Sequence, residues 1–337
     1  MVGYGHWGPN LLRNYMEFPD VRVKYVVDPR KRQLETAVRR YPTVEPLQDI
    51  AAALADPEVS AVSIATPIST HFLLAKAALE AGKHVLVEKP MTADTAQARE
   101  LVGLAAERGL TLMVGHTFVF SPPVRKVKEL IDAGELGEIY FVTTQRVNLG
   151  LHQQDVSVVW DLAPHDLSIL YYWLGQSAHK VTVTGRACIN AKIPDVAFIN
   201  LSFPSGVVAE VQVSWLSPVK LRRTIVVGSK KMLLYDDTEN VEKVKVFDHG
   251  VHMTEPSSFG EFQLSYRTGD IVSPKIEHTE PLAIEMAEFV TAVRSGRRPE
   301  SDGLSGLQVV ASLEAAEASL RGGGCEQLID AAETSRY

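Results

Sequence analysis

Gly3-Tyr4-Gly5-His6-Trp7-Gly8 stands at the start of the chain and has the spacing G-x-G-x-x-G. Between a strand and a helix, such a loop lets the backbone approach a dinucleotide pyrophosphate at the helix N-terminus. The helix side of the pattern is present, because Pro9 suits a first helical turn and residues 10–16 continue it. We therefore predict a dinucleotide-binding loop formed by Gly3, Gly5, His6, Trp7 and Gly8.

The strand side of this loop is short, since only Met1 and Val2 precede Gly3. The strand before such a loop is central in its sheet, and without it the backbone groups of both neighbouring strands stay unpaired. We expect the natural start to lie several residues upstream, so that the first strand is truncated in this sequence.

Outward from the loop, short apolar segments alternate with amphipathic ones as far as residue 115. The predicted strands cover residues 21–27, 59–65, 84–87 and 111–114, and the predicted helices cover residues 31–41, 50–55, 70–81 and 93–108. Strands separated by helices indicate a parallel sheet with right-handed crossovers, the doubly wound Rossmann architecture. A first domain is predicted over residues 1–118.

After Ser121-Pro122-Pro123 most of the apolar segments are strand-like and follow one another directly. Strands are predicted at residues 139–148, 181–189, 196–203, 207–215, 223–228 and 230–235, and helices at 124–133, 160–174, 282–294 and 304–320. Adjacent strands imply a mostly antiparallel open sheet with one covered face. The sequence predicts a second α/β domain over residues 119–337.

Asp28 follows the second predicted strand and lies 20 positions after Gly8. A carboxylate there accepts hydrogen bonds from the ribose hydroxyls and disfavours a 2′-phosphate. NAD is therefore predicted over NADP, although the nearby Arg30 and Arg32 weaken that preference. The alternative interpretation is that Asp28 is only a turn residue before Pro29.

Other residues stand where later parallel strands end, which is the edge at which such sheets bind ligands. Thr66 and Pro67 are predicted to line the cofactor, and His71 either contacts it or is a surface histidine. Glu88 and Lys89 precede Pro90 at the end of the strand over residues 84–87. His116 ends the next strand and is predicted to contact cofactor or substrate.

An isolated lysine is usually a solvated surface charge, but the crevice end of a core strand is a poor place for one. At that position Lys89 can donate to a substrate hydroxyl or stabilise a developing alkoxide, with its pKa tuned by burial. We predict that Lys89 is functional.

Trp160-Asp161-Leu162-Ala163-Pro164-His165-Asp166 is the most informative segment of the second half. Asp161 and His165 are four residues apart and share one helix face. Proline is tolerated in a first helical turn, so Asp161 is predicted to be the N-cap. An imidazole beside an acid is a candidate general base. In the alternative interpretation, Asp161 only caps the helix and His165 is a packed core histidine. Candidate substrate contacts nearby are Arg146 and Asn148.

Composition excludes several other classes. The 337 residues carry a formal net charge of −7, so there is no basic excess for nucleic acid. No apolar run approaches the roughly 18 residues of a membrane span, and no signal peptide pattern is present. The two cysteines are too few for a disulfide framework, and no His/Cys cluster has metal-ligand spacing. We expect a cytoplasmic protein without a bound metal.

Together these residues resemble the glucose-fructose oxidoreductase/inositol dehydrogenase (Gfo/Idh/MocA) family of NAD(P)-dependent sugar oxidoreductases, over nearly the whole chain. The resemblance implies a Rossmann domain and an α/β domain whose open sheet forms homo-oligomers, as dimers or tetramers. It also implies that Lys89 and His165 flank the reacting hydroxyl. We assign His165 as general base, Lys89 as the donor that polarises the oxygen, and Asp161 as the residue that orients His165. Which of Lys89 and His165 takes the proton first stays open.

Residues 5–11, 148–150 and 160–166 are similar to the nucleotide-sugar branch of this family, whose members oxidise the 3-hydroxyl of UDP-N-acetylglucosamine or its uronate. The expected function is hydride transfer between NAD and C3 of a UDP-N-acetylhexosamine. One alternative is a dehydrogenase of inositol or a free aldose. Another is a non-catalytic, dinucleotide-sensing regulator, which the presence of Lys89, Asp161 and His165 disfavours.

Overall fold

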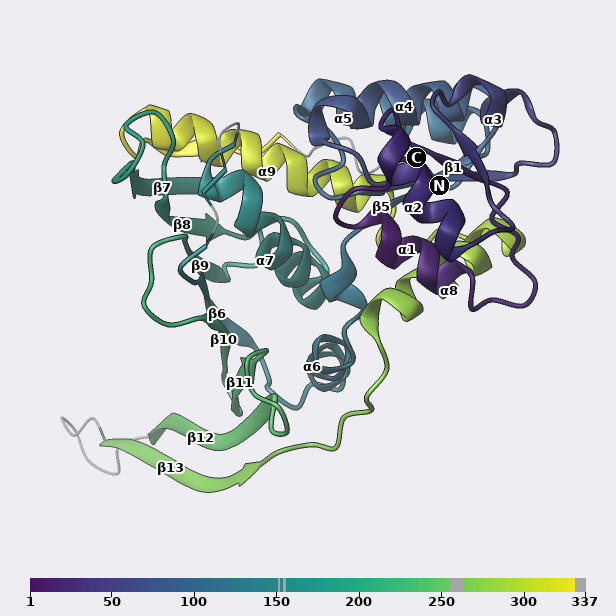
Figure 1. Ribbon diagram of the computed structural model, residues 1–337. Coiled ribbons are helices and arrows are strands. Elements are labelled where there is room, and N and C mark those ends of the chain that lie inside the picture. The colour runs from purple at the N-terminus through teal and green to yellow at the C-terminus, as the bar shows by residue number, and fades with distance from the viewer. Residues whose placement is uncertain (151, 154–155, 255–262, 331–337) are drawn as a thin grey trace. The chain divides into compact units, whose positions relative to one another are not determined.

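The computed structural model describes residues 1–150, 152–153, 156–254 and 263–330, which form two compact units (Figure 1). Unit 1 contains residues 1–120 and 279–314, and unit 2 contains residues 121–278 and 315–330. The boundary predicted after residue 118 is close to the observed one. Residues 279–314 differ from the prediction, because they fold with the first unit rather than with the second.

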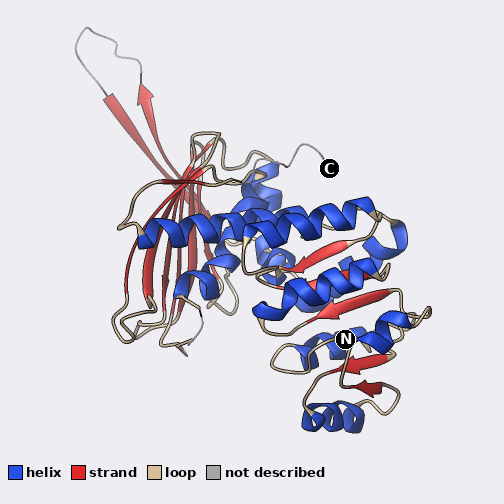
Figure 2. Ribbon diagram, turned by 90° about the horizontal axis from the view of Figure 1, so that it is seen from above, coloured by secondary structure: helices blue, strands red, loops and turns tan. Residues whose placement is uncertain are grey.

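Unit 1 is built on parallel strands. β3 (Ala61–Ile64), β4 (His84–Glu88) and β5 (Leu112–Gly115) pair in that order, and β1 (Tyr25–Val27) pairs with β2 (Glu45–Leu47). Val2 joins the two groups, because it forms parallel bridges to both Val27 and Ile64. Helices alternate with these strands along the chain, so the doubly wound parallel architecture is confirmed (Figure 2).

The α-helices of unit 1 lie close to the predicted ranges, and its 3₁₀ helix was not predicted. The helices are α1 (Gly8–Tyr15), α2 (Lys31–Arg40), α3 (Ala51–Ala55), α4 (Ile68–Glu80), α5 (Thr95–Glu107), the 3₁₀ helix η1 (Thr117–Phe120), α8 (Pro281–Ser295) and the first part of α9 (Gly303–Arg321). α5 begins after Asp94, whose side chain accepts the Gln97 N–H at 2.8 Å and so caps the helix. The central strands β3, β4 and β5 are mostly apolar and buried, as a sheet covered on both faces requires.

Two differences concern the first half of this sheet. The strand predicted over residues 21–27 is shorter in the structure, where it covers only the residues of β1. Strand β2 was not predicted, because Pro46 argues against a strand. β2 tolerates the proline because it lies at the edge of the sheet.

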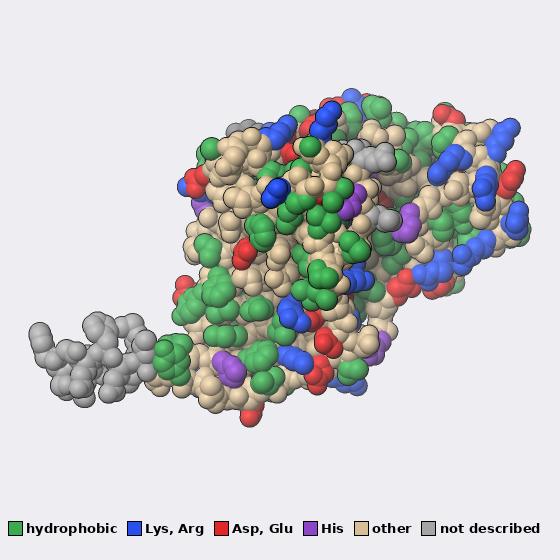
Figure 3. Space-filling model, turned by 60° about the vertical axis from the view of Figure 1, so that its left-hand side comes forward, with side chains coloured by type: hydrophobic (Ala, Val, Ile, Leu, Met, Phe, Trp, Pro, Cys, Tyr) green, Lys and Arg blue, Asp and Glu red, His purple; other side chains and the backbone are tan. Residues whose placement is uncertain are grey.

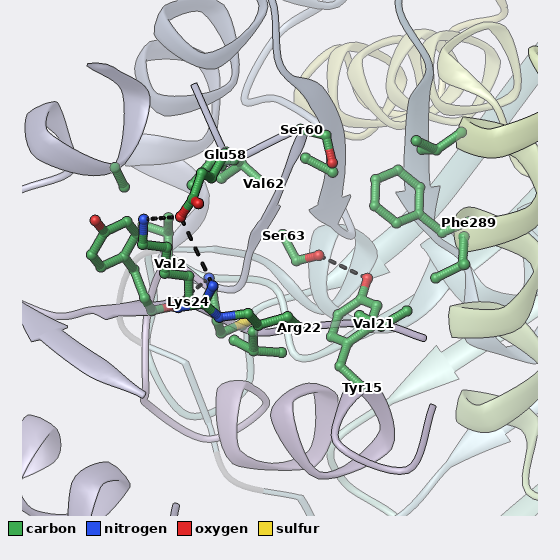
Figure 4. Close-up of a pocket in the computed structure, with 18 of the residues that line it drawn as sticks. Val2, Tyr15, Val21, Arg22, Lys24, Glu58, Ser60, Val62, Ser63 and Phe289 are labelled. Carbon is green, nitrogen blue, oxygen red and sulfur yellow. Dashed lines mark hydrogen bonds and ion pairs between the residues drawn. The ribbon is translucent and has the colours of Figure 1, made fainter. Parts of the chain in front are cut away.

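Residues 20–25 and 58–63 line a cavity of about 320 Å³, together with Tyr15 and side chains of α8 (Figure 4). The buried amino group of Met1 lies at its end and donates to the Tyr25 carbonyl at 2.9 Å. Burial lowers the pKa of that amino group to about 5. The expected upstream strand stays a prediction.

Unit 2 is built on a nine-stranded sheet. Its order is β13 (Gln263–Val272), β12 (Val244–Thr254), β11 (Met232–Asp236), β10 (Leu221–Gly228), β6 (Ile139–Val147), β9 (Val208–Ser214), β8 (Val196–Ser202), β7 (Lys180–Arg186) and β14 (Gln327–Leu328). All neighbours are antiparallel except β6 and β9, which confirms the mostly antiparallel open sheet. A turn at residues 204–206 joins β8 to β9, with Gly206 at φ +89°. β12, β13 and β14 were not predicted.

One face of this sheet is covered by α6 (Pro122–Asp132), α7 (Val158–Leu174) and the end of α9. Residues of β8 alternate accordingly, since Ala197, Ile199 and Leu201 are buried while Phe198 is exposed. No helix in the described part of the chain is long and apolar enough to cross a bilayer.

Candidate functional site

The glycines of the loop before α1 are required for different reasons. Gly3 has φ +87°, and a Cβ on it would lie 2.4 Å from the Ala65 carbonyl oxygen. A Cβ on Gly8 would lie 2.1 Å from the Gly3 carbonyl oxygen. A Cβ on Gly5 would meet only the Arg30 guanidinium, at an ordinary 3.6 Å. The chain's own packing thus requires Gly3 and Gly8, while the open side of Gly5 fits the close approach of a ligand.

The N-terminus of α1 follows directly from this loop. Trp7 is its N-cap and provides no side-chain hydrogen bond, while the Asn10 N–H already donates to the Trp7 carbonyl at 2.9 Å. The Gly8 N–H at the start of the helix is therefore the amide left for an acceptor. The positive end of the helix dipole favours an anionic one. His6 and Trp7 are exposed and pack edge to face, with ring centroids 5.6 Å apart. These residues fit the pyrophosphate of a dinucleotide.

Asp28 is buried and tied to the glycine loop. Its carboxylate accepts the Tyr4 N–H at 2.9 Å and the backbone and guanidinium N–H groups of Arg30 at 2.8–3.0 Å. The Arg30 guanidinium lowers the pKa of Asp28 to about 2. Asp28 is therefore more than a turn residue. The Arg30 side chain is 59% exposed, and a ribose that approaches Asp28 has to displace its guanidinium group.

His71 is not the surface histidine of the alternative prediction, because it is only 1% exposed. Its Nδ1 lies 2.9 Å from the Pro90 carbonyl oxygen and its Nε2 lies 2.8 Å from the Thr66 carbonyl oxygen. Burial lowers its pKa. His71 thus links the loop after β3, where Thr66 and Pro67 lie, to the loop after β4.

Glu88 ends β4 and Lys89 follows it, with a cis peptide bond between Lys89 and Pro90. Burial raises the pKa of Glu88 to about 7, although the charge of Lys89 opposes that rise. His116 at the end of β5 is 1% exposed, and neither ring nitrogen has a hydrogen-bond partner among the described residues. Burial, and then the charge of Lys89, lowers the pKa of His116 to about 3, so this imidazole is neutral. A polar ligand group at this edge would satisfy it.

Glu285 on α8 was missed by sequence reasoning. It is fully buried, and neither carboxylate oxygen has a hydrogen-bond partner in the part of the chain that the structure describes. The available signal was spacing: Leu282 precedes it by three residues and Phe289 follows by four, which places the glutamate on the apolar face.

The second group of predicted residues lies on α7 in unit 2. The helix begins at Val158 with Ser157 as N-cap, so the prediction that Asp161 is the N-cap was wrong. The start is earlier because the Val158 N–H donates to the Pro194 carbonyl, a contact distant in sequence. Pro164 consequently lies inside the helix, where it cannot donate to the carbonyl four residues before it.

The Asp161 carboxylate accepts the indole N–H of Trp215 at 2.9 Å. Trp215 is buried just after β9 and was not predicted, because the two residues are 54 positions apart. The ring of His152 lies 5.3 Å from that of Trp215. Asn148 is close as well, since its side-chain nitrogen and Trp215 Cδ1 both lie 3.1 Å from the point that a Cβ on Gly150 would occupy. The predicted residues Asp161 and Asn148 therefore belong to one cluster around Trp215.

Arg146 has a different role from the one predicted. Its guanidinium donates to the Asp166 carboxylate at 2.7 and 3.1 Å, and both side chains are buried. Thr144 donates to the same carboxylate at 3.0 Å. Arg146 holds α7 to β6, and we do not retain it as a substrate contact.

The predicted residues thus fall into two groups, each within one unit. Unit 1 contains the glycine loop, Asp28, Lys89 and His116, and unit 2 contains Asn148 with the α7 residues. Within the described ranges, no group of three His, Cys, Asp or Glu side chains is arranged to hold a metal ion.

Two family models match the chain. Residues 1–116 match an oxidoreductase family with an NAD-binding Rossmann fold, and residues 124–234 match the GFO/IDH/MocA C-terminal domain. Among curated relatives, UDP-N-acetylglucosamine 3-dehydrogenase of Acidithiobacillus ferrooxidans is 28% identical over 316 residues, which is 93% of each chain. The scyllo-inositol 2-dehydrogenase (NAD(+)) of Bacillus subtilis is also 28% identical, over 89% of this chain and 86% of the relative.

Solved structures agree with these matches. UDP-N-acetylglucosamine 3-dehydrogenase GnnA from Acidithiobacillus ferrooxidans superposes with a TM-score of 0.79 at 26% identity, over 96% of both chains. GenD2 from gentamicin A biosynthesis, solved in complex with NAD, superposes with a TM-score of 0.81 at 25% identity, over 98% of this chain and 95% of that one.

Proposed function

The chain belongs to the Gfo/Idh/MocA family of oxidoreductases with an NAD-binding Rossmann domain, and on that premise we propose that it transfers a hydride between NAD and C3 of a UDP-N-acetylhexosamine. One observation carries the proposal. The chain's own packing leaves Gly5 open beside the start of α1, which has no side-chain cap, and Lys89 directly follows β4 of the same unit. Parallel sheets bind their ligands at the carboxyl ends of the strands, so one edge serves both cofactor and chemistry.

Each residue group has its own task. The Gly8 N–H at the start of α1 binds the pyrophosphate, and Asp28 accepts the ribose hydroxyls. Lys89 donates to the substrate oxygen that loses its proton, and His165 is the general base. Trp215 fixes the Asp161 carboxylate, and Asp161 in turn orients His165. NAD, when bound, supplies C4 of its nicotinamide as the hydride acceptor.

NAD is proposed over NADP because Asp28 is held ionised. A carboxylate repels a 2′-phosphate and hydrogen-bonds a 2′-hydroxyl. Arg30 opposes this selectivity, because its guanidinium lies on Asp28 and could turn toward a phosphate instead. Use of NADP is thus weaker rather than abolished.

The substrate class rests on binding energy as well as on similarity to the UDP-N-acetylglucosamine relative. The uridine and diphosphate groups of such a substrate bind away from the reacting carbon, and their binding energy holds the reacting hydroxyl in place. The test is cofactor reduction with a panel of UDP-N-acetylglucosamine, its uronate, free N-acetylglucosamine and scyllo-inositol. We expect the UDP-sugars to have the highest kcat/KM by at least about 100-fold and UDP alone to compete.

A second candidate is a polyol dehydrogenase, because the scyllo-inositol relative is as similar in sequence as the UDP-sugar relative. Oxidation of scyllo-inositol with a higher kcat/KM than any UDP-sugar would replace the first proposal by this one. Binding of NAD without turnover of any member of the panel would instead favour a sensor.

The open face of the unit 2 sheet supports a homo-oligomer. Phe141, Phe198, Val208 and Ile225 are exposed on strands β6, β8, β9 and β10, and Figure 3 shows hydrophobic side chains gathered on one face of the molecule. Large exposed apolar surfaces of this kind are interaction sites. Light scattering should give a dimer or tetramer, and Ile225→Glu should shift it toward monomer. A wild-type monomer at micromolar concentration contradicts this assignment.

A further inference from the structure

Two buried carboxyl groups meet at the end of β5. A Cβ on Gly115 would lie 3.2 Å from Glu88 Oε2 and 3.3 Å from Glu285 Oε1. Glu88 comes from β4 and Glu285 from α8, and both elements belong to unit 1. Both carboxyl groups thus lie against the same glycine, although the two glutamates are far apart in the sequence.

Two carboxyl groups whose oxygens lie within 3.3 Å of one point in an apolar interior do not both ionise at neutral pH. Burial, and then the negative charge of Glu88, raises the pKa of Glu285 well above its usual value, and Thr117 opposes the rise only in part. Burial raises the pKa of Glu88 less, because Lys89 favours its charged form. Glu88 therefore ionises first, and Glu285 keeps its proton.

The other groups around the pair do not titrate in the neutral range. His116 is already neutral, as described above, and Thr117 carries no titratable group. Tyr15 on α1 has its pKa raised by burial, and the two glutamates add to the rise. Lys89 is the remaining neighbouring charge. A titration near neutral pH at this edge is then that of Glu88.

We propose that Glu285 is a positioning residue whose carboxyl group donates a hydrogen bond to the Glu88 carboxylate and so maintains Glu88 as the counter-ion of Lys89. The inference rests on the proposed function only through the task given to Lys89. Glu88 is anionic above its pKa, so the counter-ion is lost as the pH falls through about 7. Turnover should decline over the same interval.

The first test is a direct titration of Glu88 in the cofactor-free protein, by infrared difference spectra or by ¹³C NMR of labelled glutamate. Glu285→Gln keeps a donor and mimics the protonated acid, so the midpoint should stay within about half a pH unit. Glu285→Met has similar volume but no donor, and the midpoint should rise by about one pH unit, the scale of one hydrogen bond to a charge. Glu88→Gln identifies the signal by removing it.

A second variant allows the same measurement if Glu285→Met does not fold. Gly115→Ala retains both glutamates but places a methyl group against both carboxyl groups, and its backbone needs no positive φ. The midpoint should rise as in Glu285→Met. Glu288→Gln is the matched control, because this neighbour on α8 pairs with Arg297 instead.

The second test is the pH profile of kcat/KM. Its acid limb should move upward with the titration midpoint in Glu285→Met and stay in place in Glu285→Gln, while NAD affinity is unchanged. The proposal is overturned if Glu285→Met and Gly115→Ala leave the midpoint at the wild-type value, or if the midpoint moves and the acid limb does not. A protein that oxidises no sugar refutes the proposed function alone, since the titration of Glu88 needs no turnover.

Discussion

Each unit contains a pair of buried ionisable side chains, and the two pairs differ in chemistry. In unit 2, Arg146 and Asp166 have opposite charges and two hydrogen bonds between them. In unit 1, Glu88 and Glu285 are both acids, and no N–H or hydroxyl group among the described residues donates to Glu285. The opposite pair needs no ligand to be satisfied and fastens α7 to β6. The like pair is unfavourable for folding by itself, which is typical of positions retained for chemistry.

The largest expected effect breaks the satisfied pair. Arg146→Ala leaves Asp166 charged and buried, so the free energy of unfolding should fall by about 3–5 kcal/mol. Urea denaturation measures this loss. The double variant Arg146→Met/Asp166→Leu removes both charges and should recover most of it. If the double variant is as unstable as Arg146→Ala, the pair stabilises the fold by more than the neutralisation of two buried charges.

The next largest effect concerns the chemistry. Lys89→Ala and His165→Ala should each lower kcat by roughly 100-fold or more, the usual scale of a positioned acid or base. NAD affinity should persist in both variants, as measured by fluorescence titration. Because the groups act as a unit, the double variant should be little worse than the poorer single one. Near-normal turnover in either variant removes that residue from the mechanism.

The third effect concerns another buried titratable group of unit 1, the amino group of Met1. Adding four apolar residues before Met1 replaces this amine by an amide and lets the added segment enter the cavity beside residues 20–25. The gain in stability should be about 2–3 kcal/mol, the scale of one buried aliphatic side chain. A Gly/Ser extension of equal length is the control and should gain less.

The sign of its pH dependence follows from the lowered pKa of Met1, about 5 in the fold against 8.0 for a free amine. The unfolded chain binds the proton first, so the stability of the unextended protein is lost as the pH falls from 8 toward 5. Both extensions should abolish that slope. Parallel stability curves with and without an extension would contradict the burial of this amine.

The smallest expected effect concerns Asp28. Asp28→Ala should weaken NAD binding by about 1–3 kcal/mol and narrow the gap to NADP, because the hydrogen bonds to ribose are lost. Arg30→Ala should weaken NADP more than NAD. Isothermal titration with both cofactors gives the four affinities. An unchanged NAD affinity in Asp28→Ala excludes the carboxylate from cofactor binding.

Local patterns in the sequence predicted much of unit 1. The glycine loop, the alternation of strands and helices, and the place of Glu88 and Lys89 at a strand end all follow from sterics and hydrophobic periodicity within a few residues. The six central strands of unit 2 were predictable for the same reason. Strand β2 was not predictable, because a proline in the local pattern argues against a strand although an edge strand tolerates one.

Contacts between distant residues were decided only by the tertiary structure. The return of residues 279–314 to unit 1 buries Glu285 beside Glu88, although nearly 200 positions separate them. The pairing of Arg146 with Asp166 and of Trp215 with Asp161 likewise depends on which strand lies under α7. Propensity and spacing describe how a segment folds by itself. Whether a charge is solvated, paired or held beside another charge depends on what the rest of the chain packs against it.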